Sequence, residues 1–379
     1  MLTPTPSEQP PAPQARRPWW AVTLLAVAGV LVLAIVLGAF IRIDYFGIVP
    51  GDARTVGPRI SVEGADTFEP EGHTYFVTVG VPPLSALGAA LGWIDPDADI
   101  FTKEELLGDR SPAENKEENL KLMGYSKDFA TYVALTELGY KVGLSGGGVL
   151  IDSLCMEPGD NDTCKQQSPA DEVLDRGDLI IKIDETDIHL SSDISVALKG
   201  KKPGELADVT VKRQGKGTPV VVAAELTESS DGRTILGIIP NPNPPDDLKF
   251  CFPIDVKINS GQVSGPSAGL AFTLALMDEL TPGELTGGAR VAATGTMMLS
   301  GEVGNIGGLR QKTVAVERVD ADLFLVPVDE VGIAEEQAKG TNTKVVGVAS
   351  LDDALAAIAT LPGSNALDLG TPGEESSNA

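Results

Sequence analysis

The chain is poor in histidine and cysteine, and each shortage excludes a class of site. Only two histidines, His73 and His189, and three cysteines occur in 379 residues, and no two cysteines have CxxC spacing. Structural and catalytic zinc sites draw their ligands mainly from these residue types. We therefore expect no zinc site, no other metal and no cofactor. His189 has no partner recognisable in the sequence and is predicted to be a surface residue.

Basic residues are also scarce. The chain has 29 Lys and Arg residues against 54 Asp and Glu residues, and its formal net charge is −25. A phosphate backbone would repel such a surface, so a nucleic-acid partner is excluded. A polybasic attachment to anionic lipid is excluded for the same reason. The apolar fraction of 42% is sufficient for a sizeable core, and the length suggests two or three domains.

One long hydrophobic run lies near the N-terminus. Residues 19–41 are uncharged and apolar apart from Thr23, which suits a helix crossing about 30 Å of hydrocarbon. The alternative is a buried core helix. No typical signal-peptide cleavage site follows the run, so we predict an uncleaved single-pass anchor. Arg16 and Arg17 precede it, and the positive-inside rule then places the N-terminus in the cytoplasm and the rest of the chain outside.

Two of the cysteines are close together in the sequence. Cys155 and Cys164 lie in a loop rich in Gly, Asp and Asn, which a disulfide can close easily. Closing this loop would contribute roughly 2–3 kcal/mol in the chain-entropy model. We predict this disulfide, which fits an oxidising compartment, and interpret Cys251 as a small buried hydrophobic residue.

The remainder of the chain has mixed α+β character. The Pro-rich stretch 1–18 and the stretch 363–379 are predicted to be disordered tails. Residues 42–139 are predicted to form an α/β region that packs with the later domains. Strands are expected there at 59–63 and 74–81, and a helix at 126–139.

Residues 140–228 resemble a PDZ domain of the bacterial protease type. The pattern includes a short helix, a turn and a strand within 168–184, with other elements expected at 148–154, 192–198, 209–213 and 220–224. Such a domain binds an extended peptide at a sheet edge. The resemblance implies a carboxylate-binding loop at 142–148 and a peptide-binding strand at Gly148, Val149, Leu150 and Ile151. The alternative is that these glycines only form a turn.

A candidate nucleophile lies in the sequence Gly-Pro-Ser-Ala-Gly at residues 265–269. This motif opens a long apolar segment that ends at Leu280, so we expect Ser267 at the start of a buried helix. Ala268 and Gly269 would leave room for a peptide carbonyl, and free N–H groups at a helix start can stabilise an oxyanion. The alternative is that Ser267 only caps the helix.

The matching base must be a residue other than histidine. None follows residue 189, so a Ser-His-Asp triad within this region is excluded, but a neutral lysine can replace the histidine. Lys312 lies near the start of a predicted helix, where burial and the helix dipole would both lower its pKa. Lys257 is the rival candidate, but it alternates with Val256 and Ile258 like the exposed side of a strand.

These motifs together resemble the proteolytic domain of Lon proteases, over residues 235–362. The resemblance is carried by residues 264–269, 293–295, 301–312 and 323–328. It implies that Ser267 is the catalytic serine, Lys312 the catalytic lysine and Thr294 a residue that supports the lysine. Gly265, Pro266, Ala268 and Gly269 complete the serine motif. Ser264 stands where Lon proteases often carry an acidic residue.

The whole layout resembles bacterial membrane-anchored, PDZ-containing Lon-like proteases. The sequence lacks a GxxxxGK[ST] loop, which implies an ATP-independent endopeptidase for unfolded or flexible segments at the outer face of the membrane. The PDZ domain would recruit or gate protein substrates, and a homo-oligomer such as a hexameric ring is expected. Two alternatives are a non-proteolytic PDZ receptor with a silent Lon-like domain, and a scaffold that chaperones membrane proteins.

Overall fold

A computed structural model describes residues 19–158, 164–215, 217–229, 232–241, 245 and 247–368, apart from the side chains of Ala21 and Ser192. The predicted tails, 1–18 and the part of 363–379 from residue 369 onward, therefore lie outside the described residues. Helices and strands are both abundant, so the predicted α+β class is confirmed. The chain forms two compact units, one of residues 1–50 and 79–110 and one of residues 51–78 and 111–379. The predicted region 42–139 is thus divided between them.

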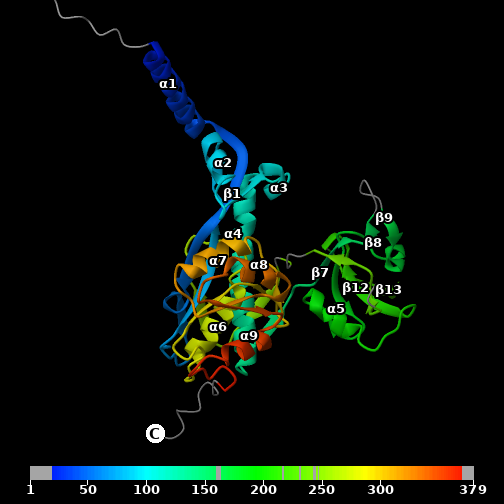
Figure 1. Ribbon diagram of the computed structural model, residues 1–379. Coiled ribbons are helices and arrows are strands. Elements are labelled where there is room, and N and C mark those ends of the chain that lie inside the picture. Colours follow the sequence, from blue (N-terminus) through cyan, green and yellow to red (C-terminus); the bar gives the residue numbers. More distant parts are fainter. Residues whose placement is uncertain are drawn as a thin grey trace, which may run out of the picture. The chain divides into compact units, whose positions relative to one another are not determined.

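The first unit contains the apolar helix α1 (Trp19–Phe40). Within it, residues 22–40 have a mean hydropathy of 2.8 and no share of them is buried, so the helix is long and apolar enough to cross a membrane. Strand β1 (Arg42–Thr55) follows, and β4 (Pro83–Ser85) and β5 (Asp99–Thr102) pair with it in antiparallel fashion. The two short helices of this unit are α2 (Ala86–Gly92) and α3 (Lys103–Leu107) (Figure 1).

The second unit is built on a parallel sheet. Its strands are ordered β23 (Lys344–Val348), β22 (Leu323–Pro327), β19 (Arg290–Ala293) and β3 (His73–Gly80). Val291 of β19 is paired with Leu323 on one side and with Thr74 on the other. Strand β3 comes from the region before the PDZ-like segment, so the sheet that contains β19, β22 and β23 also includes a strand from well before residue 235.

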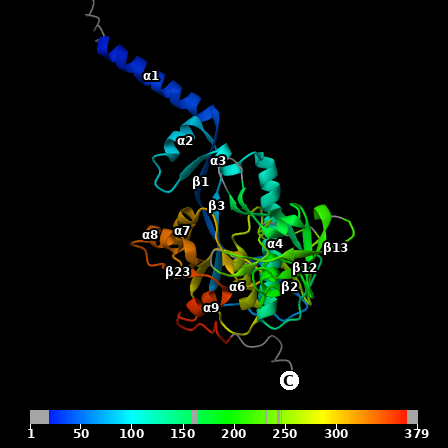
Figure 2. The same cartoon turned by 90° about the vertical axis from the view of Figure 1, so that its right-hand side faces the viewer.

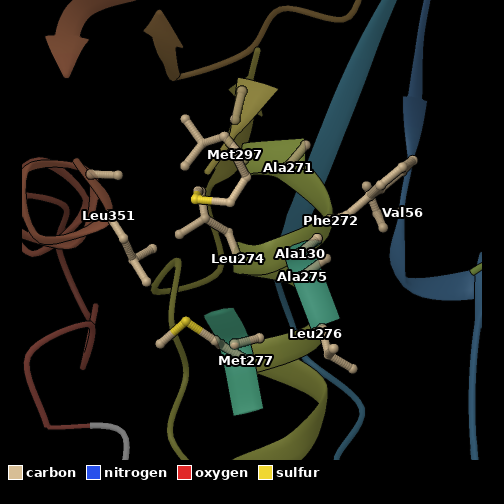
Figure 3. Packing of buried hydrophobic residues seen from close by; sticks show 14 of the residues in the cluster. Val56, Ala130, Ala271, Phe272, Leu274, Ala275, Leu276, Met277, Met297 and Leu351 are labelled. Carbon is tan, nitrogen blue, oxygen red and sulfur yellow. The ribbon is translucent and has the colours of Figure 1, made fainter. Parts of the chain in front are cut away.

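Helix α6 (Gly269–Leu280) is the centre of the core. All but one of its 12 residues are buried, as expected for a helix that is predominantly apolar. Figure 3 shows its side chains, including Phe272 and Leu276, packed with Val56, Met297 and Leu351. Helices α7 (Leu309–Glu317), α8 (Val331–Gln337) and α9 (Leu351–Ile358) complete this part of the unit.

Helix α4 (Pro112–Glu137) is longer than the predicted helix at 126–139. Ser111 and Glu114 form a capping box, and Pro112 occupies the first turn, which together favour a helix start at this point. The acidic stretch 114–118 therefore belongs to the first turns of α4. The helix predicted from the sequence began too late because the first turns of α4 lack an apolar periodicity.

The PDZ-like segment contains the predicted strands and helix. Its sheet has the order β13 (Val220–Glu225), β12 (Leu206–Lys212), β10 (Leu179–Ile183), β7 (Val149–Ser153) and β16 (Ile239–Pro240), with α5 (Ser191–Ala197) alongside. Figure 2 labels β12 and β13 of this sheet. Its buried residues form a separate apolar core.

The remaining strands pair in short ribbons or flank this sheet. They are β2 (Ile60–Glu63) with β18 (Asp255–Ile258), β6 (Gly143–Ser145) with β17 (Lys249–Cys251), β8 (Cys155–Pro158) with β9 (Cys164–Gln167), β14 (Thr227–Glu228) with β15 (Thr234–Ile235), β20 (Thr296–Met297) with β21 (Val303–Gly304), and β11 (Thr186–Asp187) with β10. Cys155 and Cys164 form the disulfide that their spacing predicts. Cys251, in contrast, is exposed at the end of β17, so its interpretation as a buried residue was wrong.

Candidate active site

Ser267 lies in a turn just before α6. The helix begins at Gly269 with Ala268 as its N-cap residue, and no side chain caps it, so Ser267 is neither inside the helix nor its cap. The carbonyl oxygen of Ser267 accepts hydrogen bonds from the N–H of Gly295 (2.9 Å) and the hydroxyl of Thr294 (3.1 Å). These two bonds hold the serine backbone against the end of β19.

Helix α4 supports the same turn from another direction. The N–H of Gly265 donates to the carbonyl of Asn119 (2.8 Å), and the hydroxyl of Ser126 donates to the carbonyl of Pro266 (2.9 Å). Gly265 has a φ of +94°, a conformation that favours glycine. Sequence reasoning missed Asn119 and Ser126, because no local motif marks either residue.

Lys312 extends from α7 toward this turn. Its amine nitrogen Nζ lies 2.7 Å from Ser267 Oγ and 3.0 Å from Thr294 Oγ1. The helix begins after Gly308, whose left-handed conformation (φ 69°) turns the chain into α7. The structure therefore brings together the three residues that the sequence motifs place far apart.

The surroundings of Lys312 favour its neutral form. Its side chain is only 2% exposed, and this burial lowers its pKa from the ordinary value of 10.5 to about 7. The carboxylate of Glu330 acts in the opposite direction and raises the pKa. Glu330 also accepts a hydrogen bond from the N–H of Ile306 (2.9 Å), in the loop that leads into α7. A large fraction of the amine is consequently neutral near pH 7.

Two small residues of the serine motif, Ala268 and Gly269, pack against the core. Ala268 is buried, and a Cβ atom added to Gly269 would lie 2.7 Å from the backbone nitrogen of Met297. Both residues therefore pack against the core, and the expectation that they leave room for a peptide carbonyl stays a prediction. The N–H of Gly269 faces the carbonyl of Pro266 (3.3 Å). For the N–H groups of Ser267 and Ala268 no acceptor is found among the described residues, and both remain candidates for an oxyanion site.

The rival residues are placed elsewhere. Lys257 of β18 is exposed and pairs with Asp255 (2.6 Å) and Glu63 (3.7 Å), and the bond to Asp255 raises its pKa further. It therefore stays charged and cannot act as a base at neutral pH. His73 is part of β3, and His189 Nδ1 lies 2.6 Å from the carbonyl of Gly146. In the described part of the chain, no cluster of three or more potential metal ligands occurs.

The predicted peptide-binding strand is an interior strand of its sheet. Val149 and Leu150 pair with β10, and Ile151 pairs with Pro240 of β16 on the other side. The N–H of Gly148 donates to the carbonyl of His189. A peptide could join these residues only by displacing β16, so peptide binding by Gly148, Val149, Leu150 and Ile151 stays a prediction.

The proposed carboxylate-binding loop at 142–148 is likewise occupied by the chain. Residues 143–145 form β6, which pairs with β17. Gly146, Gly147 and Gly148 all have positive φ, and the N–H of Gly147 lies 3.3 Å from the carboxylate of Asp247. The geometry agrees with the alternative interpretation, in which these glycines form a turn.

Comparison with known proteins identifies two domains. Residues 250–358 match the C-terminal proteolytic domain of Lon protease (S16), and residues 137–223 match the PDZ domain. The Lon protease of Ureaplasma parvum is 33% identical over 88 residues, and that of Vibrio parahaemolyticus is 38% identical over 93 residues. A mitochondrial Lon protease homolog of Neurospora crassa is 37% identical over 78 residues.

These matches cover limited parts of each protein. They extend over 23%, 24% and 20% of this chain, which spans only 11%, 12% and 7% of the length of the three relatives. Among solved structures, the PDZ domain of an SdrC-like protein from Listeria monocytogenes is 26% identical, with 25% of this chain and 90% of that chain covered and a TM-score of 0.20.

Proposed function

Because the chain contains a Lon-type proteolytic domain and a PDZ domain, we propose that it is a serine endopeptidase with Ser267 as nucleophile and Lys312 as general base. The observation that carries the proposal is the 2.7 Å separation between Lys312 Nζ and Ser267 Oγ at a buried lysine. A nucleophile and a base within hydrogen-bond distance are the geometric requirement for activating a hydroxyl.

The reaction follows from this geometry. Neutral Lys312 takes the proton of Ser267 as Oγ attacks the carbonyl carbon of the scissile peptide bond. The resulting ammonium gives this proton to the leaving amine, which departs and leaves an acyl-enzyme. Water, activated by the same amine, then hydrolyses the ester and restores Ser267. The N–H groups of Ser267 and Ala268 are proposed to stabilise the oxyanion in both steps.

Thr294 orients the base in this scheme. Its hydroxyl lies 3.0 Å from Lys312 Nζ, and it donates its own hydrogen to the carbonyl of Ser267. The oxygen of Thr294 therefore presents its lone pairs to the amine. We assign it the role of keeping Lys312 directed at Ser267 in both protonation states.

The setting of the reaction is also part of the proposal. Helix α1 would anchor the chain in the cytoplasmic membrane with the N-terminus inside and the catalytic domain outside, where the Cys155–Cys164 disulfide is compatible with an oxidising environment. Substrates would be unfolded or flexible protein segments, cleaved without ATP. The PDZ domain would recruit or gate them, and the chain is proposed to act as a homo-oligomer such as a hexameric ring.

A direct assay separates this function from a non-proteolytic receptor or scaffold. Full-length protein in lipid nanodiscs is incubated with a reduced, carboxymethylated protein substrate without nucleotide, and new N-termini are mapped by mass spectrometry. We expect cleavage by the wild type and none by Ser267→Ala. Equal cleavage by both would assign the activity to a contaminant and reject the proposal, and no cleavage by the wild type would favour the receptor or scaffold.

A further inference from the structure

Helix α2 ends in a cluster of exposed apolar side chains, which we call the α2 tip. It consists of Leu91, Trp93 and Ile94, whose exposed fractions are 55%, 65% and 78%. Residues 74–94 contain no charged side chain. A contiguous exposed apolar cluster that includes a tryptophan is typical of a surface with a binding partner.

The α2 tip belongs to an element that packs against the C-terminal end of α1. The N–H of Ala86, the first residue of α2, donates to the carbonyl of Ile41 (2.9 Å). A Cβ atom added to Gly38 would lie 3.6 Å from Cβ of Leu87, so the two helices touch where α1 completes its last turns. Figures 1 and 2 both show α2 next to this end of α1.

The length of α1 sets the depth of this contact. Its 22 residues span about 33 Å at a rise of about 1.5 Å per residue. The hydrocarbon layer of a bilayer is about 30 Å thick. If α1 crosses the membrane, Phe40 and Ile41 lie at the boundary between hydrocarbon and headgroups, and α2 begins at the same level.

Aromatic residues support this placement. The rings of Trp93 and Tyr45 meet edge to face, with centroids 6.2 Å apart. Tyr and Trp are enriched at membrane interfaces because an apolar ring and a polar N–H or O–H suit the headgroup layer. Phe40 and Ile41 are 81% and 54% exposed, so the exposed apolar surface of α1 extends to its C-terminal end, where α2 begins.

We propose that the α2 tip lies in the headgroup layer of the leaflet from which α1 emerges and acts as a second, interfacial membrane contact. This inference rests on the proposed insertion of α1. Asp95, Asp97 and Asp99 follow the tip directly, so the contact depends on apolar burial and not on attraction to anionic lipid. It would restrict the orientation of the first unit on the membrane, which a single helix alone does not do.

Tryptophan fluorescence tests the proposal. The chain has three tryptophans, and the full-length variant Trp19→Phe/Trp20→Phe leaves Trp93 as the sole emitter. It is reconstituted in phosphatidylcholine vesicles with and without bromine on the upper acyl chain, and iodide serves as the aqueous quencher. We expect the bromolipid to quench most of the Trp93 emission and iodide to have little effect. The added changes Leu91→Ser and Ile94→Ser should decrease the bromolipid quenching.

The remaining results overturn the inference in distinguishable ways. Strong iodide quenching without bromolipid quenching would place Trp93 in water. Shielding from both quenchers that depends on protein concentration would indicate a second copy of the chain on the α2 tip. Flotation of the protein with vesicles, and bromolipid quenching of Trp20 in Trp19→Phe/Trp93→Phe, report insertion of α1 separately. Failure of those two measurements would reject the anchor itself.

Discussion

Lys312 combines a buried position with a charge-bearing side chain. Its amine is surrounded by the hydroxyls of Ser267 and Thr294 and is almost fully removed from solvent. Burial penalises the ammonium form, and Glu330 offsets this penalty only in part. The low pKa that the proposed reaction needs is therefore a property of the position of Lys312 in the fold.

The first prediction concerns the identity of the base. Lys312→Arg should be inactive although it keeps a positive charge, because a guanidinium does not deprotonate in proteins. In the wild type, kcat/KM should rise with pH through a pKa of about 7. The measurement is peptide cleavage across pH, with circular dichroism to show that the variant folds. Wild-type turnover by folded Lys312→Arg would reject Lys312 as the base.

The second prediction concerns Glu330. Glu330→Gln keeps an acceptor for the N–H of Ile306 but removes the negative charge that raises the pKa of Lys312. The acid limb of the pH–rate profile should therefore move to lower pH. The matched control is Glu335→Gln on the exposed side of α8, which should leave the profile unchanged. A shift of the acid limb to higher pH in Glu330→Gln would contradict the assignment.

The third prediction concerns stability. Lys312 has a pKa of about 7 in the folded chain and an ordinary value of 10.5, so below about pH 7 the folded state bears the full cost of a buried charge. Its contribution becomes less unfavourable as the pH rises from about 7 to 10.5. Lys312→Met should therefore raise the free energy of unfolding by on the order of 1–3 kcal/mol at about pH 6.

Chemical denaturation at several pH values measures this effect. The gain from Lys312→Met should shrink as the pH rises from about 7 toward 10.5, because the wild-type lysine is then neutral in the folded state and the cost of a buried charge is lost. A variant that is less stable than the wild type at about pH 6 would show that the hydrogen bonds of Lys312 outweigh its desolvation.

Among the secondary-structure elements, helix α4 supports the turn that carries Ser267, the proposed nucleophile. It lies before the PDZ domain in the sequence, yet Asn119 and Ser126 bond directly to residues 265 and 266. The helix is itself well defined by its capping box and by its buried face. Ser267, the proposed nucleophile, is therefore supported by an element outside the matched range 250–358.

The fourth prediction tests this support. Ser126→Ala removes the donor to the Pro266 carbonyl, and the loss of one neutral hydrogen bond is about 1 kcal/mol, which corresponds to a roughly fivefold lower kcat. KM should change little, because Ser126 is buried and bonds to the turn. Thr136→Ala on the same helix, whose hydroxyl bonds within α4, is the control. Equal kcat for Ser126→Ala and the wild type would remove α4 from the positioning of Ser267.

Strand β16 covers one edge of strand β7 in the PDZ domain. It occupies the side of β7 that faces away from β10, at Ser153 and Ile151. A strand pairing of two residues is short and offers few hydrogen bonds. The segment that leads from the PDZ domain toward β17 is thus the element that a peptide would have to replace at this edge.

At the scale of the whole molecule, the PDZ segment interrupts the proteolytic fold. Strand β3 and helix α4 precede it in the chain, whereas α6, β19 and α7 follow it. Ser126 and Pro266 are 140 positions apart and form a hydrogen bond. A truncated chain of residues 235–362 would therefore lack strand β3 and helix α4, which supports the turn that carries Ser267. We expect this truncated chain not to fold into an active enzyme.

The fifth prediction concerns topology. Arg16 and Arg17 precede α1, so the C-terminal domains should face outward. Protease added to wall-stripped cells should digest a C-terminal epitope tag without detergent. Arg16→Glu/Arg17→Glu should decrease this accessible fraction, because the positive charges that retain the N-terminus are lost. Protection of the tag in the wild type, with digestion only after lysis, would reverse the orientation.

Features that depend on neighbouring residues can be predicted from the amino-acid sequence. The uncharged run at 19–41, the Gly-Pro-Ser-Ala-Gly turn and the glycines before Lys312 are all local patterns, and each is visible within about 25 residues. The last two patterns, together with residues 293–295, carry the resemblance that pointed to Ser267, Lys312 and Thr294. The absence of histidine after residue 189 also left lysine as the candidate base in this region.

Contacts between distant segments, in contrast, become apparent only in the folded chain. It placed β3 and α4 in the proteolytic fold, covered β7 with β16, exposed Cys251, and buried Lys312 next to Ser267 with Glu330 nearby. These outcomes depend on contacts between residues far apart in the chain, which carry no local pattern. The amine of Lys312 is buried only in the folded chain, and this burial is what lowers its pKa.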